Sequence, residues 1–280
     1  MSTSVGRSHR TPAKHALMRK IVGSEIGAAG NQWAIQRLRY LDLTAGDGLA
    51  DESAPGGWEH NCSPGIAAYY ARYSRKPIEV ILYEIQAATF DRLTRNLSER
   101  LPGLGYERTG DEWVCGNARL RLVHDSGARA LVTDVTKQTA VLVSNDPNAI
   151  TDWAMRPSFA AEISHRTPWF RAISTMGCNP AGLKRLPPED RRVWFEHIES
   201  QVRSLPNHKD LLLVEIERDD AQWAYLLCEP AKWRKQAERS ALLAFSAHGL
   251  SVNWAWWKTE RSRFTEIEQR LFLTKKERSA

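Results

Sequence analysis

The chain has 280 residues, of which 42% are hydrophobic and 26% charged, a composition typical of one large globular domain with or without appendages. No apolar run approaches the roughly 20 residues that a bilayer-spanning helix needs, and the N-terminus lacks the apolar core of a signal peptide. We therefore expect a cytoplasmic protein without membrane contact. The formal net charge of +6 favours a polyanionic partner without requiring one.

The first thirteen residues contain Arg7, His9 and Arg10 and no acid, so a basic flexible arm is expected at 1–13. Such an arm is either simply disordered or in contact with phosphates. We expect one main domain at 14–230, and an extension at 231–280 that packs on it.

Along the main domain, hydrophobic periodicity alternates between two kinds of element. Helical spacing predicts helices at 14–29, 87–100, 151–165 and 188–205, and another from Ser63, with Ser63 as N-cap and Pro64 as the first helical residue. Apolar runs predict strands at 37–42, 78–85, 140–146 and 170–177, a turn and then a strand within 113–125, and a hairpin of 210–217 with 222–229. A helix near 230–248 and apolar-alternating segments at 252–257 and 270–274 close the chain. This alternation predicts an α/β fold, a parallel sheet with helices on both faces and a late antiparallel hairpin.

Polar residues or glycines that could bind a ligand follow four of these strands. In a doubly wound sheet, ligands bind at the carboxyl ends of the strands. The first strand runs into Asp42–Gly48, the second ends at Glu84, the third at Asp125 and the fourth at 145–148, Asn-Asp-Pro-Asn. A nicotinamide-binding site is disfavoured. It would need GxGxxG leading straight into a helix, and here the next helix begins only near residue 63.

The stretch DLTAGDG at 42–48 resembles motif I of class I S-adenosylmethionine-dependent methyltransferases. More narrowly, the chain resembles the three-Cys-motif partner family over roughly residues 12–245. The matching pieces are KHAL at 14–17, YLDLTAGDG, CSPGIA at 62–67, LYEIQAATFDRL at 82–93, NDPN at 145–148, STMGCNPAGLKR at 174–185 and the hairpin before CEP. Two departures are Asn148, where the family usually has an aromatic residue, and an extended C-terminal tail.

The resemblance implies a Rossmann-like fold of seven strands, six parallel and one antiparallel, that binds S-adenosylmethionine. It places five motif I residues at the cofactor: Asp42, Thr44, Gly46, Asp47 and Gly48. Glu84 would accept hydrogen bonds from the ribose hydroxyls, and Asp125 would meet the adenine edge. Asp146 and Pro147 would lie beside the transferring methyl group.

Methyltransferases that act on base amino groups end the corresponding strand in a D/N/S-P-P-aromatic sequence. The resemblance implies that Asp146, Pro147 and Asn148 occupy these motif positions here. Asp146 would accept a hydrogen bond from the target amino group, which aligns the nitrogen lone pair with the methyl group. Asn148 cannot stack on a flipped base, so Trp58 or Trp153 would have to do so. His60 would also face the substrate. The alternatives are an ordinary Asp-Pro turn here, a turn cap at Asp125 and a solvent-exposed His60.

The function expected from these residues is methyl transfer to nucleic acid, DNA or RNA, on an exocyclic base nitrogen. Two other classes stay open, a fold without activity that binds nucleic acid or a partner protein, and a methyltransferase for protein or small molecules. Basic residues interleave with tryptophans at 231–239 and 254–264, which predicts either a second nucleic-acid face or a solvated surface over core tryptophans.

No metal is expected, because the four cysteines form no CxxC pair and the eight histidines no HExxH pair. Cys62 and Cys178 have no activating base apparent in the sequence, and we expect both to be packing residues.

Overall fold

The structure is a computed structural model that describes residues 11–49, 56–130, 132, 134–146, 157–176, 196, 199–200, 203–218, 221–231, 234–247 and 249–272. Helix α1 (Thr11–Asn31) begins inside the segment expected to be an arm, and residues 1–10 lie outside the described part. Contacts divide the chain into two compact units, Met1–Ser144 and Asn145–Ala280. The expected division at 230 therefore stays a prediction, and each unit is described by itself.

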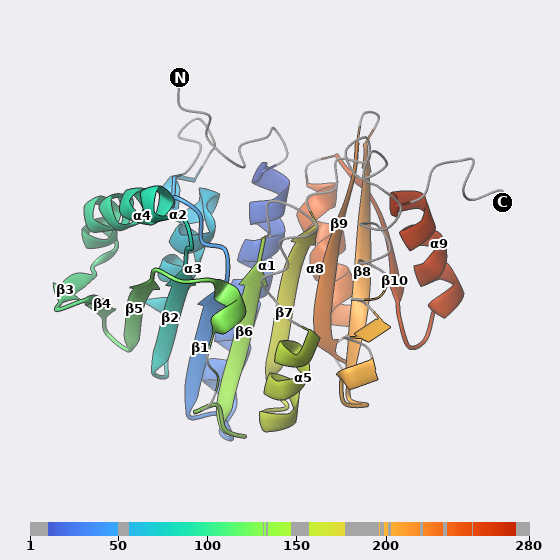
Figure 1. Cartoon of the computed structure of the whole chain (residues 1–280), viewed down its shortest axis with the longest axis horizontal. Coiled ribbons are helices and arrows are strands. Elements are labelled where there is room, and N and C mark those ends of the chain that lie inside the picture. The colour runs from blue at the N-terminus through green and yellow to red at the C-terminus, as the bar shows by residue number, and fades with distance from the viewer. Residues whose placement is uncertain are drawn as a thin grey trace. The chain divides into compact units, whose positions relative to one another are not determined.

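Unit 1 contains a sheet whose central strands are parallel (Figure 1). Its order is β6-β1-β2-β5-β4-β3, in which β1, β2, β5 and β6 run parallel and β4 and β3 are added antiparallel. The strands are β1 (Arg37–Asp42), β2 (Ile78–Tyr83), β3 (Glu107–Thr109), β4 (Glu112–Cys115), β5 (Ala118–Val123) and β6 (Thr139–Asn145). All seven residues of β6 are buried, as is usual for a parallel strand enclosed on both faces.

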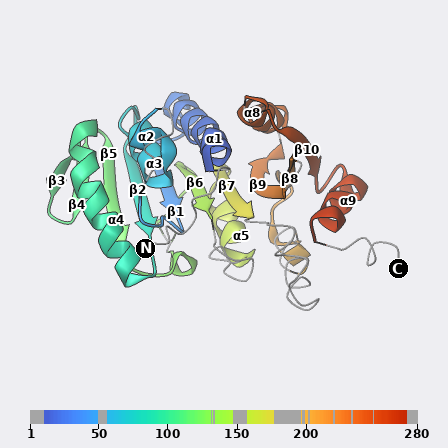
Figure 2. The same ribbon diagram turned by 90° about the horizontal axis from the view of Figure 1, so that it is seen from above.

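Helices α1, α2 (Trp58–Asn61) and α3 (Ser63–Ala71) pack on one another in a layer on one side of β1 and β2 (Figure 2). Helix α4 (Ala87–Arg100) has the bounds that the sequence predicts and buries Leu93 and Leu97. The start of α3 differs by one residue from the prediction. Its N-cap is Cys62, whose sulfur accepts a hydrogen bond from the Gly65 amide at 3.3 Å. The Ser63 hydroxyl is thereby left for another partner.

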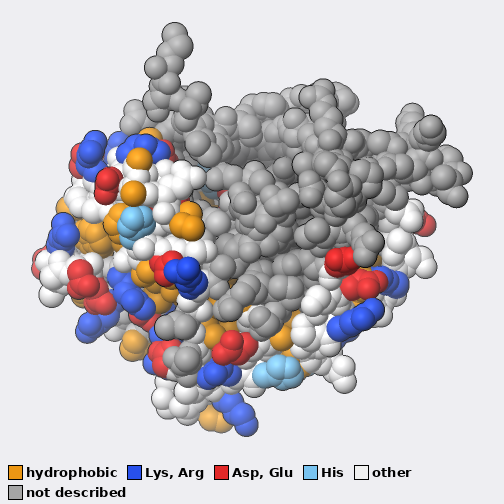
Figure 3. Space-filling model, in the orientation of Figure 1, with side chains coloured by type: hydrophobic (Ala, Val, Ile, Leu, Met, Phe, Trp, Pro, Cys, Tyr) orange, Lys and Arg blue, Asp and Glu red, His pale blue; other side chains and the backbone are white. Residues whose placement is uncertain are grey.

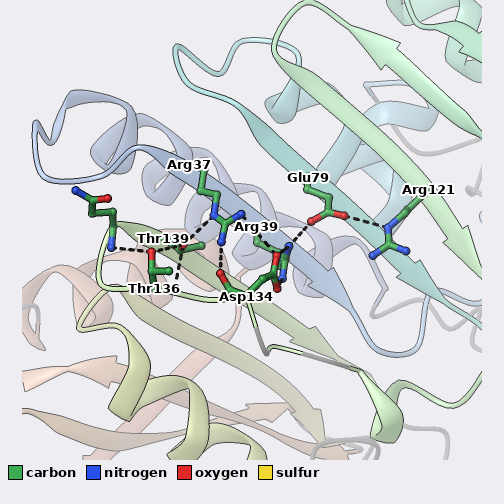
Figure 4. A network of polar contacts seen from close by, with 8 residues as sticks. Arg37, Arg39, Glu79, Arg121, Asp134, Thr136 and Thr139 are labelled. Carbon is green, nitrogen blue, oxygen red and sulfur yellow. Dashed lines mark hydrogen bonds and ion pairs between the residues drawn. The ribbon is translucent and has the colours of Figure 1, made fainter.

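The connection from β5 to β6 includes a short helical turn, η2 (Gly127–Arg129), and Asp134. A ladder of charged side chains crosses β1, β2 and β5 on the face of the sheet opposite α3, since Arg39 precedes Tyr40, whose hydroxyl meets Ser63 (Figure 4). The two terminal guanidinium nitrogens of Arg39 donate to the two Asp134 carboxylate oxygens, each at 2.6 Å, and Arg39 also forms an ion pair with Glu79 at 2.6 Å. Glu79 continues the ladder to Arg121 at 3.0 Å. Each arginine of the ladder thus faces a carboxylate.

Unit 2 is an antiparallel sheet of order β10-β8-β9-β7. Its strands are β7 (Phe170–Met176), β8 (Lys209–Arg218), β9 (Ala221–Pro230) and β10 (Ser251–Trp256), and its helices are α5 (Pro157–Arg166), α8 (Arg234–Ser246) and α9 (Arg261–Phe272). The predicted hairpin is confirmed as β8–β9, and β10 coincides with the alternating segment at 252–257. The second alternating segment begins inside α9, where the 3.6-residue period outweighs the short alternation.

The predicted α/β class, Rossmann-like with parallel central strands, is confirmed, because the order β5-β2-β1-β6 is the 3-2-1-4 order of a doubly wound sheet. The strand count differs, since the described residues hold ten strands where seven were expected. The segment 113–125 accounts for part of the difference, since it forms β4 and β5. Within the described residues, no helix is long and apolar enough to cross a bilayer.

Candidate functional site

Three acidic residues predicted from the sequence lie at one edge of the unit 1 sheet. Asp42 is the last residue of β1, Glu84 follows β2 directly and Asp125 follows β5 by two positions. Strand register aligns these ends, since Asp42 is opposite Leu82 in β2 and the Glu84 amide donates to the Val123 carbonyl at 3.1 Å. The carboxyl ends of the parallel strands therefore meet where the sequence expects them.

The loop after β1 is tied to both neighbouring strands. The Leu43 amide donates to the Ser144 carbonyl at 2.9 Å, and the Ala45 amide donates to the Tyr83 carbonyl at 2.9 Å. Gly46 and Gly48 have φ angles of 66° and 65°, which disfavour any residue with a Cβ. The backbone here is thus held in a tight turn at the sheet edge.

Asp42 is buried, with 1% of its surface exposed, and both carboxylate oxygens have protein partners. Oδ1 accepts the Thr44 amide at 3.2 Å, and Oδ2 accepts a short hydrogen bond from the Ser63 hydroxyl. Two separate sequence motifs, DLTAGDG and CSPGIA, therefore meet at this carboxylate. Its geometry fits a residue that shapes the loop rather than one exposed to a ligand.

Asp47 and Gly48 join the loop to α4. The Asp47 carbonyl accepts a hydrogen bond from the Asn96 side chain at 2.7 Å, and a Cβ at Gly48 would lie 2.7 Å from Leu93 Cδ1. The Asp47 carboxylate accepts the Leu49 amide at 3.1 Å. The second glycine of the motif is therefore required by its backbone angle and by the close approach of α4.

Trp58, expected near the substrate, is 9% exposed and donates its indole N–H to the Gly48 carbonyl at 2.7 Å. This hydrogen bond ties α2 to the loop that follows β1. His60 is half-buried, and its Nδ1 is buried without a hydrogen-bond partner among the described residues. Its ring lies 4.6 Å from the Tyr69 ring, so it faces the outer side of α3.

Glu84 is 9% exposed, and its Oε1 accepts the Gln86 amide at 2.8 Å. The structure shows no hydrogen bond to its Oε2 from any described residue, so this oxygen keeps its acceptor capacity. The next residue, Ile85, is 63% exposed and presents an apolar side chain beside Glu84. The sequence-based prediction did not include Ile85 among the site residues, although it directly follows Glu84.

Asp125 is more open than Glu84, with 41% of its side chain exposed. Its Oδ1 accepts the Ser126 amide at 2.7 Å and lies 3.3 Å from Arg129, so both contacts fall within its own turn, as the turn-cap alternative expects. The same turn packs on the loop after β1, since a Cβ at Gly127 would lie 2.6 Å from Leu43 Cα. Gly127 is a further residue of this edge that the sequence did not single out.

The fourth predicted strand end is described only in part. Asn145, the last residue of β6, is fully buried, and its side-chain oxygen and nitrogen have no hydrogen-bond partner among the described residues. Asp146 is half-buried. Pro147, Asn148 and Trp153 lie outside the described residues.

Burial raises the pKa of the Cys62 thiol to about 12, and its sulfur approaches the Trp58 carbonyl at 3.6 Å, which fits the packing role expected for it. Cys178 lies outside the described residues. The described part of the chain contains no group of three or more His, Cys, Asp and Glu side chains that is arranged to hold a metal ion.

The tryptophans of the C-terminal segment include core residues, as the solvated-surface alternative expects. Trp256 is 2% exposed and donates its indole N–H to Glu238 at 2.6 Å. Arg234 lies near the same ring at 5.4 Å and pairs with buried Asp210 at 2.6 Å. Two groups that the sequence offered for nucleic acid are thus engaged within unit 2.

Comparison with known proteins identifies the fold. No protein-family model and no curated protein matches the chain. Among solved structures, LPL1258 from Legionella pneumophila is similar at a TM-score of 0.51 and 9% identity, over 89% of this chain and 97% of that one. The S-adenosyl-L-methionine complex of Trm1 from Pyrococcus horikoshii gives a TM-score of 0.44 and 14% identity, over 84% of this chain and 60% of that one. An rRNA methylase from Streptococcus thermophilus gives a TM-score of 0.41 and 12% identity, over 75% of this chain and 94% of that one. The likeness to LPL1258 shows a shared fold.

Proposed function

We propose that the chain is an S-adenosylmethionine-dependent methyltransferase that acts on nucleic acid, with an exocyclic base nitrogen as the methyl acceptor. The observation that carries the proposal is the pairing of two features on adjacent parallel strands. A glycine turn with positive φ angles follows β1, and a buried carboxylate with an open oxygen follows β2. A nucleoside cofactor needs both, a backbone it can approach closely and an acceptor for its ribose hydroxyls.

The residues of unit 1 fit such a cofactor. Glu84 Oε2 would accept hydrogen bonds from the ribose hydroxyls, and exposed Ile85 would offer an apolar surface to the adenine beside Asp125. The turn at 42–48 would lie against the methionine part, with Asp42 holding its shape through Thr44 and Ser63. When bound, the cofactor supplies an electrophilic methyl group on a sulfonium, so the protein's task is alignment.

The acceptor class rests on the residues that follow β6. Asp146 would accept a hydrogen bond from a base amino group and so orient its lone pair toward the methyl group, with Pro147 stiffening the turn. The resemblance to the three-Cys-motif partner family belongs to the same proposal. The net charge of +6 supports a polyanionic substrate.

Calorimetry with S-adenosylmethionine tests the cofactor half. We expect micromolar binding by the wild type and at least tenfold weaker binding by Glu84→Ala. Glu99→Ala is the matched control, because Glu99 is an exposed acid on α4, and it should bind as the wild type does. Absence of binding by a folded wild type, or equal binding by the Glu84 and Glu99 variants, would contradict the proposed site.

A methyltransferase fold that binds nucleic acid or a partner protein without catalysis is the second candidate. The observation in its favour is Asn148, which replaces the aromatic residue expected to stack on a flipped base. Transfer of a radiolabelled methyl group to total RNA or DNA, lost in Asp146→Ala, would support the enzyme. Cofactor binding without transfer to RNA, DNA, protein or small molecules would support the inactive fold.

A further inference from the structure

A cluster of two tyrosines and an arginine lies at the C-terminal end of α3. Arg72 and Tyr73 follow Tyr69 by three and four positions, at and just after the end of α3, so the last helical turn brings all three to one side. The Tyr69 and Tyr73 ring centres are 5.5 Å apart, and the Arg72 guanidinium carbon lies 4.6 and 4.5 Å from them. A short hydrogen bond joins the Arg72 guanidinium to the Tyr73 hydroxyl. We call these three residues the tyrosine–arginine cluster.

The cluster is partly exposed, and Tyr73 is its most open member. Tyr73 is 60% exposed, whereas the tyrosines of the strands and of the segment after α4 are buried, namely Tyr40, Tyr83 and Tyr106. Arg72 Nε is buried and has no hydrogen-bond partner among the described residues. Two rings edge to face, with a guanidinium over them, form a partly open aromatic surface, and aromatic side chains with a nearby arginine are the groups on which nucleic-acid bases stack.

The surrounding helical layer carries an excess of positive charge. Residues 14–31 and 56–77 contain six Lys or Arg and two acids, a net charge of +4, and one of the acids, Glu25, is only 2% exposed. The six basic residues are Lys14, Arg19, Lys20, Arg72, Arg75 and Lys76. The charged ladder on the sheet is different, since its arginines face carboxylates. On the face drawn in Figure 3, basic and acidic side chains are interspersed over the described part.

The cluster is continuous with the loop of the candidate site. The His60 ring packs edge-on against Tyr69 at 4.6 Å, and the His60 carbonyl accepts a hydrogen bond from Arg19 at 2.5 Å. His60 belongs to α2, whose first residue, Trp58, donates to the Gly48 carbonyl. A chain of contacts thus runs from the glycine turn through α2 to the outer side of α3.

We propose that this surface, from His60 over Tyr69 and Arg72 to Tyr73, binds a single-stranded segment of nucleic acid. It would hold the phosphates through the surrounding basic residues and stack bases on the tyrosines. The inference rests on the proposed function only for the class of substrate, nucleic acid. It adds the surface on which that substrate would bind. The two tyrosine rings favour nucleic-acid bases over an acidic peptide, because bases carry flat aromatic faces that stack and acidic side chains carry none.

Fluorescence anisotropy with short labelled single-stranded RNA and DNA of the same mixed sequence tests the surface. Tyr73→Ser should weaken binding about tenfold, the loss expected for one stacked base. Lys20→Gln should lower the slope of log affinity against log salt by about 0.7, the value for one lost phosphate contact on a single strand. The controls are Leu243→Ser, an exposed apolar residue on α8, and Arg95→Gln, an exposed arginine on α4. Both should bind within twofold of the wild type.

The outcomes separate this inference from the proposed function. Unchanged nucleic-acid binding by Tyr73→Ser, or a wild type that binds neither the RNA nor the DNA, overturns the proposed surface. S-adenosylmethionine binding, measured on the same samples, tests the cofactor site independently. Polyglutamate that binds as tightly as RNA, with no loss of RNA affinity in Tyr73→Ser, would show that binding depends on charge alone and would overturn the surface as well. Tighter binding of the RNA or of the DNA would identify which nucleic acid is the substrate, and either result would support the surface.

Discussion

The Ser63 hydroxyl donates a hydrogen bond to the Asp42 carboxylate and so ties the first turn of α3 to the end of β1. The hydroxyl is available because Cys62, one position earlier, caps the helix. The Tyr40 hydroxyl lies 3.5 Å from the same Ser63 oxygen, and burial next to Asp42 raises the pKa of Tyr40 well above its ordinary value. Two motifs 21 positions apart in the chain therefore form one buried polar group.

Replacing Ser63 by Ala should loosen the candidate cofactor loop. The change removes one hydrogen bond from a buried carboxylate, which costs on the order of 1–3 kcal/mol in the free energy of unfolding. We expect S-adenosylmethionine affinity to fall as well, measured by calorimetry on protein shown to be folded by circular dichroism. Ser98→Ala is the control, because the Ser98 hydroxyl donates to a carbonyl within α4. An unchanged affinity in Ser63→Ala would show that the contact does not shape the loop.

Replacing Gly48 by Ala should abolish the loop conformation. Alanine at a φ of 65° costs roughly 1–2 kcal/mol, and its Cβ would lie 2.7 Å from Leu93. We expect at least tenfold weaker cofactor binding, with α4 displaced. Gly103→Ala is the matched control, because a Cβ there meets nothing within 4 Å. Equal affinities for the two variants would remove the turn from the cofactor site.

Replacing Asp134 by Asn should destabilise the sheet of unit 1 at neutral pH. The hydrogen bonds from Arg39 lower the pKa of Asp134 to about 2 from an ordinary value of 3.8. The stabilising contribution is therefore complete above about pH 4 and is lost as the pH falls through 2. Urea denaturation at pH 7 should give a lower unfolding free energy for the variant, by a modest amount since the carboxylate is half exposed. Asp111→Asn, an exposed acid in the turn before β4, should leave it unchanged.

Replacing His15 by Gln should flatten the dependence of stability on pH below 6.5. Burial and then the nearby cations Lys14 and Arg19 lower the pKa of His15 to about 3 from 6.5. Between these values the unfolded chain takes up a proton that the folded protein does not bind, so unfolding becomes easier as the pH falls, by about 1.4 kcal/mol per pH unit. Denaturation curves from pH 7 to pH 4 should show a smaller loss in His15→Gln than in the wild type or in His165→Gln, an exposed histidine on α5.

Local periodicity was sufficient for most of the architecture. The bounds of α4, a strand beginning at residue 78 and the antiparallel hairpin all follow from apolar spacing and from turn residues, which act over a few positions; the strand expected at 78–85 ends at Tyr83. The acids at the ends of β1, β2 and β5 could be placed at one edge for the same reason, since parallel strands in one sheet end together.

The partners of individual side chains could not be predicted in this way. Nothing near Trp58 in the sequence indicates that its indole meets Gly48, and nothing near Arg39 indicates Glu79 and Asp134. These contacts depend on strand register and on the angle at which a helix packs, which are set by the whole core.

The sequence by itself thus determined the α/β class, the glycine turn and the acids that follow the strands, because each is written in neighbouring residues. Only the tertiary structure decided that Asp42 is held by Ser63 and that Trp58 supports the loop. It also decided that Tyr69, Arg72 and Tyr73 contact one another at the end of α3. The physical reason is that packing joins groups across tens of residues, and only the folded chain fixes which of them meet.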